Sequence, residues 1–386
     1  MRVTIVTMLP LLATLVAGSA VGAERFRLVP TERPTPRSCI EVERRREAKV
    51  VAFYDEHGTI VKEITLELPC NYPVVSRNKQ NVVIREPVGD CDIYVKYRLS
   101  LYDQLGQLIA ASEPLSLYDR YANPLGDGKT VLVVTEAVDQ PFFGIAVLQG
   151  QGGELREIRH LGYAGSGPAL DVAMDGSCFT MMAGPQEGEK TAQAILLRPD
   201  GTVAWSTALD EGLTGPGLAI SPRLNFIVAP SKDSITHQRF ANLLDVDGRR
   251  IAKIAIGGVG VPKVAFTHDA SERFAAICHG NEILVLDTVD GRTILSHIDS
   301  DLGVAFWDCA ILANRTALVG MTVGLPSVNH PTVATYLAVL DPEGLYRKLK
   351  APFDGTPRVQ SIGTGNYLEI TSPKGVRWVE IMEGGL

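Results

Sequence analysis

The sequence has no long segment with the hydrophobic periodicity of a helix. From residue 48 onward, short apolar runs alternate with turns, a pattern typical of β-strands joined by tight connections. Hydrophobic residues make up 45% of the 386 residues and charged residues 21%, as in an ordinary globular protein with a sizeable core. The pattern and the composition together favour an all-β protein.

Local motifs of catalysis and metal binding are also missing. The sequence contains no Gly-x-Ser-x-Gly elbow, no His-Glu-x-x-His zinc motif and no Cys-x-x-Cys pair. Its Gly-rich pieces, 162–167 and 257–260, lack the spacing of dinucleotide- or phosphate-binding loops. The sequence therefore indicates no particular cofactor and leaves open whether the protein is an enzyme.

An excess of positive charge is absent as well. The formal net charge is −7 at pH 7, which gives no electrostatic reason to expect nucleic acid or an anionic membrane as a partner. The basic triplet at 44–46 lies among Glu41, Glu43 and Glu47. We interpret this segment as a solvated, charge-balanced surface.

A long apolar run occurs only at the N-terminus, from Val3 to Val16. It follows Arg2 and precedes small residues that end in Val21-Gly22-Ala23, the layout of a secretory signal peptide cleaved before Glu24. An uncleaved membrane anchor is the alternative. We expect a signal peptide at 1–23, a secreted or periplasmic mature protein, and no membrane span after signal removal.

The cysteines fall into two groups. An exported protein meets oxidising conditions, which permit disulfides, and Cys70–Cys91 is the pair we favour because it would close a modest loop. Spacing alone does not choose among the possible pairings of the mature chain, which also contains Cys39. The remaining cysteines lie in or beside strand-like runs, where we expect buried free thiols: Cys178, Cys278 and Cys309.

Two series of turns recur along the chain with one shared phase. The first series repeats about every 48 residues, a spacing typical of propeller blades, at Asn78, Asp127, Asp175, Arg223, Asp269, Asn314 and Thr364. The second series ends in a glycine, which supplies the positive φ that closes a hairpin, at Gly58, Gly106, Gly153, Gly201, Gly248, Gly291 and Gly344. Two independent series in phase predict repeated units of similar build.

The cleanest unit runs from Phe266 to His297, where apolar strands surround turns at Asp269 and Asp290-Gly291. In its Asp-Gly turns followed by apolar strands, the chain resembles β-propeller families with WD-type (WD40-like) or lactonase-type repeats. The resemblance covers roughly 48–386 and, with the seven repeats, implies a seven-bladed β-propeller of four-stranded blades. It implies no activity, because such propellers host many functions. Residues 24–47 are rich in Arg, Pro and Glu, which predicts an extended lead-in to the propeller.

The last repeat has room for three strands only. We predict that the N-terminus supplies the fourth: Ile60–Leu66 should pair with Val376–Met382, with Val50–Tyr54 as an extra outer strand. This arrangement removes the exposed sheet edge that an open array would leave. The alternative is a separate β-domain at 40–112 followed by six blades.

Function is expected in the connections between the second and third strands of each blade, several of which are long and polar. Histidines occur in these connections in successive units. Convergent imidazoles can bind a ligand or a metal, or act in acid–base catalysis, whereas the alternative is three unrelated loop histidines. The candidate ligand-binding residues are His237, His279 and His330, with Lys232, Asp233 and Arg239 nearby.

Regular repeats, varied loops and the absence of a recognisable catalytic set favour an exported binding scaffold. The ligand would be a protein or a small molecule held on the loop-rich face. The alternative is a lactonase- or lyase-like enzyme with a histidine-containing site in the central funnel.

Overall fold

The computed structural model shows an all-β protein. All regular secondary structure among the described residues is β-strand. The structure describes residues 26–31, 40–45, 48–66, 71–88, 96–116, 122–136, 142–164, 169–183, 191–211, 217–233, 235–257, 261–301, 304–312, 314–323, 334–350, 358–362, 367–372 and 375–383. The predicted signal peptide lies outside these ranges.

The strands form consecutive four-stranded antiparallel sheets, which we call blades. Blade 1 contains β5 (Tyr72–Val75), β6 (Val82–Val88), β7 (Lys96–Tyr102) and β8 (Leu108–Ala111), with the short β9 (Leu115–Ser116) beside β7. Blade 2 contains β10 (Ala122–Pro124), β11 (Thr130–Glu136), β12 (Phe142–Gln151) and β13 (Glu154–Ala164). Blade 3 contains β14 (Ala169–Val172), β15 (Phe179–Ala183), β16 (Thr191–Leu197) and β17 (Val203–Glu211). A single parallel pairing of Glu154 with Ala111 joins blades 1 and 2.

The second half of the chain repeats the same unit. Blade 4 contains β18 (Ala219–Ile220), β19 (Phe226–Lys232), β20 (Arg239–Asp245) and β21 (Arg250–Ile256). Blade 5 contains β22 (Lys263–Phe266), β23 (Phe274–His279), β24 (Glu282–Asp287) and β25 (Thr293–Ile298). Blade 6 contains β26 (Val304–Ile311), β27 (Ala317–Val323), β28 (Ala334–Leu340) and β29 (Tyr346–Lys350). Blade 7 contains β30 (Arg358–Ile362), β31 (Tyr367–Ser372) and β32 (Gly375–Glu383), together with β1 (Phe26–Thr31).

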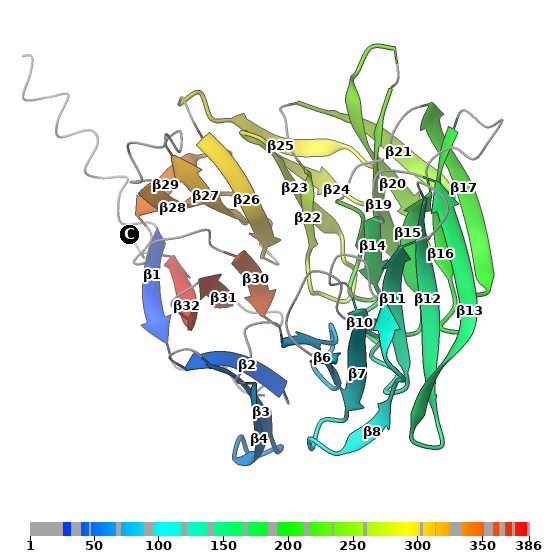
Figure 1. Cartoon of the computed structure of the whole chain (residues 1–386). Helices are drawn as coiled ribbons and strands as arrows, with labels where there is room; N and C mark the ends of the chain where they lie inside the picture. Colours follow the sequence, from blue (N-terminus) through cyan, green and yellow to red (C-terminus); the bar gives the residue numbers. More distant parts are fainter. Residues whose placement is uncertain are drawn as a thin grey trace, which may run out of the picture.

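The blades surround a central axis, with the first strand of each blade nearest that axis (Figure 1). Neighbouring blades pack face to face, so a blade's middle strands are covered on both sides. In blade 5, for example, β23 and β24 are almost wholly buried and the outermost β25 is largely exposed. Leu243 of blade 4 packs in one cluster with Ile277 and Leu286 of blade 5. The predicted all-β propeller of four-stranded blades is therefore confirmed.

The fourth strand of blade 7 is N-terminal, but it is not the strand that we predicted. Strand β1 pairs antiparallel with β32, from Phe26 opposite Glu383 to Thr31 opposite Trp378. Because β1 occupies this edge of β32, Ile60–Leu66 does not pair there, and that prediction is wrong. The predicted lead-in at 24–47 contributes both β1 and β2 (Ile40–Arg45).

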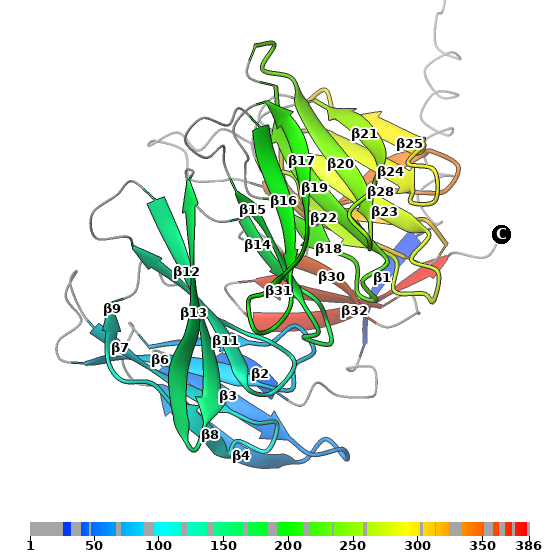
Figure 2. The same cartoon turned by 90° about the vertical axis from the view of Figure 1, so that its right-hand side faces the viewer.

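The N-terminal hairpin instead belongs to a separate three-stranded sheet of β2, β3 (Ala48–Tyr54) and β4 (Ile60–Leu66). This sheet lies between blades 7 and 1 in Figure 1 and beside blade 1 in Figure 2. Val51 and Phe53 of β3 are fully buried in one cluster with Val82 and Ile84 of blade 1. Blade 1 is itself a regular four-stranded blade and pairs with blade 2 between Ala111 and Glu154, which favours one propeller over the alternative of a separate domain at 40–112.

The second-series glycines show that the three-stranded sheet occupies the position of a blade. A Cβ on Gly201 of blade 3 would meet Arg159 of blade 2 at 2.7 Å, and one on Gly248 of blade 4 would meet Trp205 of blade 3 at 2.6 Å. A Cβ on Gly106 of blade 1 would likewise meet Lys62 of β4 at 2.7 Å. In blades 1, 3 and 4 this turn therefore rests on the sheet before it, and β2–β4 precedes blade 1 in the ring.

The first-series turns also share one backbone feature. Each described turn between the first and second strand of a blade contains a residue with positive φ: Lys79, Gly128, Gly176, Leu224, Glu272 and Arg315. Most of these are not glycine, although positive φ costs other residues free energy. The turn geometry therefore belongs to the repeat itself and is kept even where glycine is absent. The turn at Thr364 lies outside the described residues.

Candidate functional site

The structure brings together only part of the predicted histidine site. His279, at the end of β23, is 1% exposed, and its Nε2 lies 3.0 Å from Nη1 of Arg239 in the neighbouring blade. Its Nδ1 contacts the carbonyl oxygen of Gly257. Because arginine only donates, Nε2 accepts and Nδ1–H donates to the carbonyl. His279 thus connects blades 4 and 5, and the lone pair of its Nε2 is engaged by Arg239. His330 lies outside the described residues.

The other predicted residues share one hairpin, which joins β19 to β20. Asp233 Oδ1 accepts hydrogen bonds from the backbone N–H groups of Thr236 at 2.7 Å and Ile235 at 2.9 Å, and these lower the pKa of its carboxyl group. His237 has φ 59° and an exposed side chain, and Lys232 pairs with Arg239 across the hairpin. Asp233 therefore stabilises the conformation of the loop. In the described ranges, no group of three or more metal-ligating side chains occurs.

The hairpin extends beyond the loops around it (Figures 1 and 2). Its tip carries Ile235, which is 82% exposed, the largest value among the exposed large hydrophobic residues that the structure describes. The backbone around the tip is closed by hydrogen bonds from His237 N to Asp233 O and from Asp233 N to Gln238 O. A large apolar side chain is thus held in water by a fixed turn.

A second candidate site is the cavity along the central axis, with a volume of about 560 Å³. The innermost strands and first-series turns of the blades form its walls. One repeat position, the residue directly before the turn residue that set the period, lines this cavity in several blades. It is occupied by Arg77, Met174, Pro222 and His268. At this position blades 1 and 5 carry an ionisable side chain, whereas blades 3 and 4 carry an apolar one.

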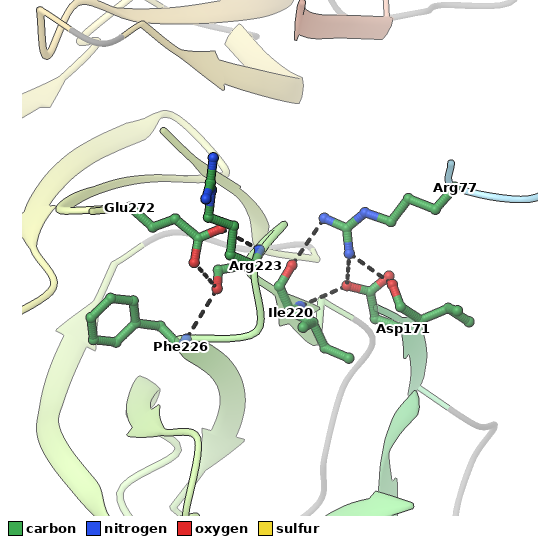
Figure 3. Close-up of polar contacts among 8 residues, drawn as sticks. Arg77, Asp171, Ile220, Arg223, Phe226 and Glu272 are labelled. Atoms are coloured by element: carbon green, nitrogen blue, oxygen red, sulfur yellow. Dashed lines mark hydrogen bonds and ion pairs between the residues drawn. The ribbon is translucent and has the colours of Figure 1, made fainter. Parts of the chain in front are cut away.

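Arg77 reaches from blade 1 across the cavity to blades 3 and 4 (Figure 3). Its Nη1 lies 3.1 Å from Asp171 Oδ2 and 2.9 Å from the Val172 carbonyl oxygen, and its Nη2 lies 2.9 Å from the Ile220 carbonyl oxygen. Asp171 Oδ2 also accepts the Ile220 N–H at 2.6 Å. One ion pair therefore holds three blades around the axis.

Glu272 makes a neighbouring connection between blades 4 and 5, also drawn in Figure 3. Its carboxylate is fully buried and accepts hydrogen bonds from Ser221 Oγ at 2.6 Å and Arg223 N at 2.5 Å. Ser221 Oγ in turn accepts the Phe226 N–H at 3.0 Å. This carboxylate fixes the first-series turn of the preceding blade.

The remaining ionisable groups of the cavity wall are Asp308, Lys263 and His268. Asp308 accepts backbone N–H groups of Cys309 at 3.0 Å and of Val359 in the next blade at 3.1 Å. Lys263 is exposed to the cavity. Burial, followed by the charge of Arg77, lowers the pKa of His268, so its imidazole is mainly neutral near pH 7.

Sequence reasoning missed the cavity residues. Arg77 and His268 directly precede Asn78 and Asp269, the turn residues that revealed the repeat. A comparison of the residues at that position would have found both. Their convergence could not have been found, because Arg77 and Asp171 are 94 residues apart in the chain.

The buried thiols agree with expectation: Cys178, Cys278 and Cys309 are free and buried. The favoured disulfide, Cys70–Cys91, lies outside the described residues. Within the described part of the chain, no helix is long and apolar enough to cross a membrane.

Comparison with solved structures establishes the fold class. The chain is similar to the C-terminal WD40 domain of Sif2, with 13% identity over 91% of this chain and 94% of that one, at a TM-score of 0.57. It is also similar to BamB from Moraxella catarrhalis, with 13% identity over 92% and 99% of the two chains and a TM-score of 0.50. The Dos1 propeller gives 10% identity over 92% and 95%, at 0.51.

The chain is a β-propeller. At these identities the likeness extends to the fold and not to a shared activity. No protein-family profile and no curated protein sequence matches the chain. What this propeller does must therefore be argued from its own residues.

Proposed function

We propose that this protein is an exported propeller scaffold that binds a protein partner on the face carrying its loops between second and third strands. The β19–β20 hairpin would be the main contact. The observation that supports this most directly is Ile235, 82% exposed at the tip of a hairpin that projects from the ring. Export is inferred from the N-terminal segment of the sequence alone.

A projecting apolar tip fits a protein partner better than a small molecule. Small-molecule sites are concave and enclose the ligand, whereas Ile235 is convex and needs a pocket on the other molecule. The hydrogen bonds of Asp233 to the tip backbone fix the loop before binding. A pre-organised anchor loses little conformational entropy on association, which favours its use in recognition.

The experiment compares two exposed aliphatic residues on opposite faces. Val289 is 68% exposed in the turn between the third and fourth strands of blade 5. Antiparallel strands place this turn on the face opposite to the β19–β20 loop. A photo-crosslinking amino acid would replace Ile235 or Val289 in the full chain, expressed in the native host.

We expect a discrete crosslinked partner from position 235 and none from position 289. With the purified partner, Ile235→Asp should then weaken binding at least about tenfold, while Val289→Asp should not. Equal crosslinking from both positions, or equal affinities of the two variants, would reject the hairpin as the contact. Export is tested separately, by mass spectrometry of the mature N-terminus, which we expect at Glu24.

A further inference from the structure

The central cavity contains a guanidinium group whose donors are only partly used. Hydrogen bonds to Asp171, Val172 and Ile220 engage Nη1 and Nη2 of Arg77. They leave the Nε–H and one Nη2–H without an acceptor among the described residues. These two donors lie along one edge of the planar group. Figure 3 shows that the edge faces away from Asp171 and Ile220.

A free guanidinium edge is suited to one kind of ligand. Two parallel N–H donors match two oxygens of a carboxylate or a phosphate, and such bidentate, charge-assisted pairs are among the stronger hydrogen bonds in proteins. The ion pair with Asp171 and the two backbone carbonyls hold the guanidinium in place, so binding would cost little side-chain entropy. We propose that the central cavity binds a small carboxylate or phosphate anion, held by the free edge of Arg77 and the imidazole of His268.

His268 is placed to complete this site. Its side chain lines the same cavity and has no hydrogen-bond partner in the part of the chain that the structure describes. Burial and, after it, the charge of Arg77 lower the pKa of the imidazole, so Arg77 acts at this side chain. A neutral imidazole can still donate one N–H to an anionic oxygen.

The other charges of the wall are each held by a partner or balanced by a charge of opposite sign. Asp171 is neutralised by Arg77, and Asp308 accepts backbone N–H groups from Cys309 and Val359. Lys263 adds an exposed ammonium group that forms no ion pair with the described residues. The formal charges of the wall therefore balance, with Arg77 and Lys263 against Asp171 and Asp308, and the attraction for an anion is local to the free edge of Arg77 and to Lys263.

The cavity has the size of a ligand site. Its volume of about 560 Å³ lies within the usual range of roughly 300–1,000 Å³ for small-molecule pockets. Met174, Pro222 and Leu170 add apolar wall. An organic acid or a phosphate ester fits this combination of one anion-binding edge and apolar sides. The site is separate from the β19–β20 hairpin, so the test of anion binding does not depend on whether the hairpin binds a protein partner.

The test uses the full mature protein and two defined probes. Inorganic phosphate and succinate would each be titrated by calorimetry at constant ionic strength, with chloride as the balancing anion. The variants are His268→Leu and Arg77→Lys, since lysine keeps the charge but lacks the bidentate edge. Lys96→Met, a charge removed from an exposed position at the start of β7, is the control.

We expect saturable binding of at least one probe. His268→Leu should weaken it about 3- to 10-fold and Arg77→Lys about tenfold or more, with Lys96→Met unchanged. Binding of phosphate alone would assign a phosphate ligand, and binding of succinate alone a carboxylate. If Arg77→Lys does not fold, His268→Leu decides. Failure of both probes to bind, or an equal loss in Lys96→Met and His268→Leu, would overturn the proposal.

Discussion

Glu272 is the residue whose replacement should reveal most clearly how neighbouring blades are joined. Its carboxylate is 0% exposed and accepts short hydrogen bonds from Ser221 Oγ and Arg223 N in blade 4, with a longer contact of 3.4 Å from Asn225 N. Glu272→Ala removes the acceptor and leaves these donors facing a cavity. The backbone strain at φ 46° is unchanged, because alanine and glutamate have similar difficulty there.

The magnitude follows from the two short bonds. A hydrogen bond to a charged group contributes about 1.5–3 kcal/mol, so loss of two such bonds in Glu272→Ala should reduce the free energy of unfolding by about 3–6 kcal/mol. Glu272→Gln keeps the shape and one acceptor oxygen but turns an NH₂ group toward a donor. We expect roughly half the loss for that variant.

The assay combines a global and a local measurement. Urea denaturation gives the change in unfolding free energy, and hydrogen exchange at Arg223 N reports the turn that Glu272 holds. Glu343→Ala, an exposed glutamate in a turn of blade 6, is the matched control and should change stability by less than about 0.5 kcal/mol. Equal stability of the two alanine variants, or unchanged exchange at Arg223, would refute the role of Glu272 as a connection between blades.

Three further outcomes can be measured on the same protein. Burial raises the pKa of Cys178 to about 11, so a thiol reagent at pH 8 should modify it only when the protein unfolds. Burial alone would raise the pKa of Asp299, but hydrogen bonds, led by that from Lys348, outweigh it and lower the pKa. This carboxylate therefore stabilises the folded protein at pH values above its unfolded pKa of about 3.9, and the stabilisation is lost in more acidic solution. Between about pH 4 and 2, the melting temperature of Asp299→Asn should therefore fall less than that of the wild type. The new methyl group of Gly153→Ala meets no atom within 4 Å, so this variant should lose only about 1–2 kcal/mol of unfolding free energy, from the strain of positive φ. The methyl group of Gly248→Ala also clashes with the ring of Trp205, so this variant should lose more. Equal losses of unfolding free energy would contradict the packing of the Gly248 turn on the preceding blade.

The histidine prediction shows why a site is harder to infer than a fold. A Gly-Asn pair follows His279 in the sequence and predicts a loop position for this residue. In the structure β23 continues through His279, and Arg239 of the neighbouring blade covers its ring. Burial by another blade has no local signal, since it depends on residues 40 positions away. Lys232, Asp233 and His237 do share one loop because they are close in sequence.

The repeat, the strand-and-turn unit and the buried thiols can all be inferred from the order of residues alone. Each of these depends on local chemistry: Asp or Asn opens a turn, glycine tolerates positive φ, and apolar runs fill the space between blades. The tertiary structure alone decided which strand completes blade 7. Both β1 and β4 are competent strands, and only one can take the free edge of β32. It also decided the cavity site, where Arg77 meets Ile220 from 143 residues away. Contacts of that range arise from closing the ring, which no local pattern encodes.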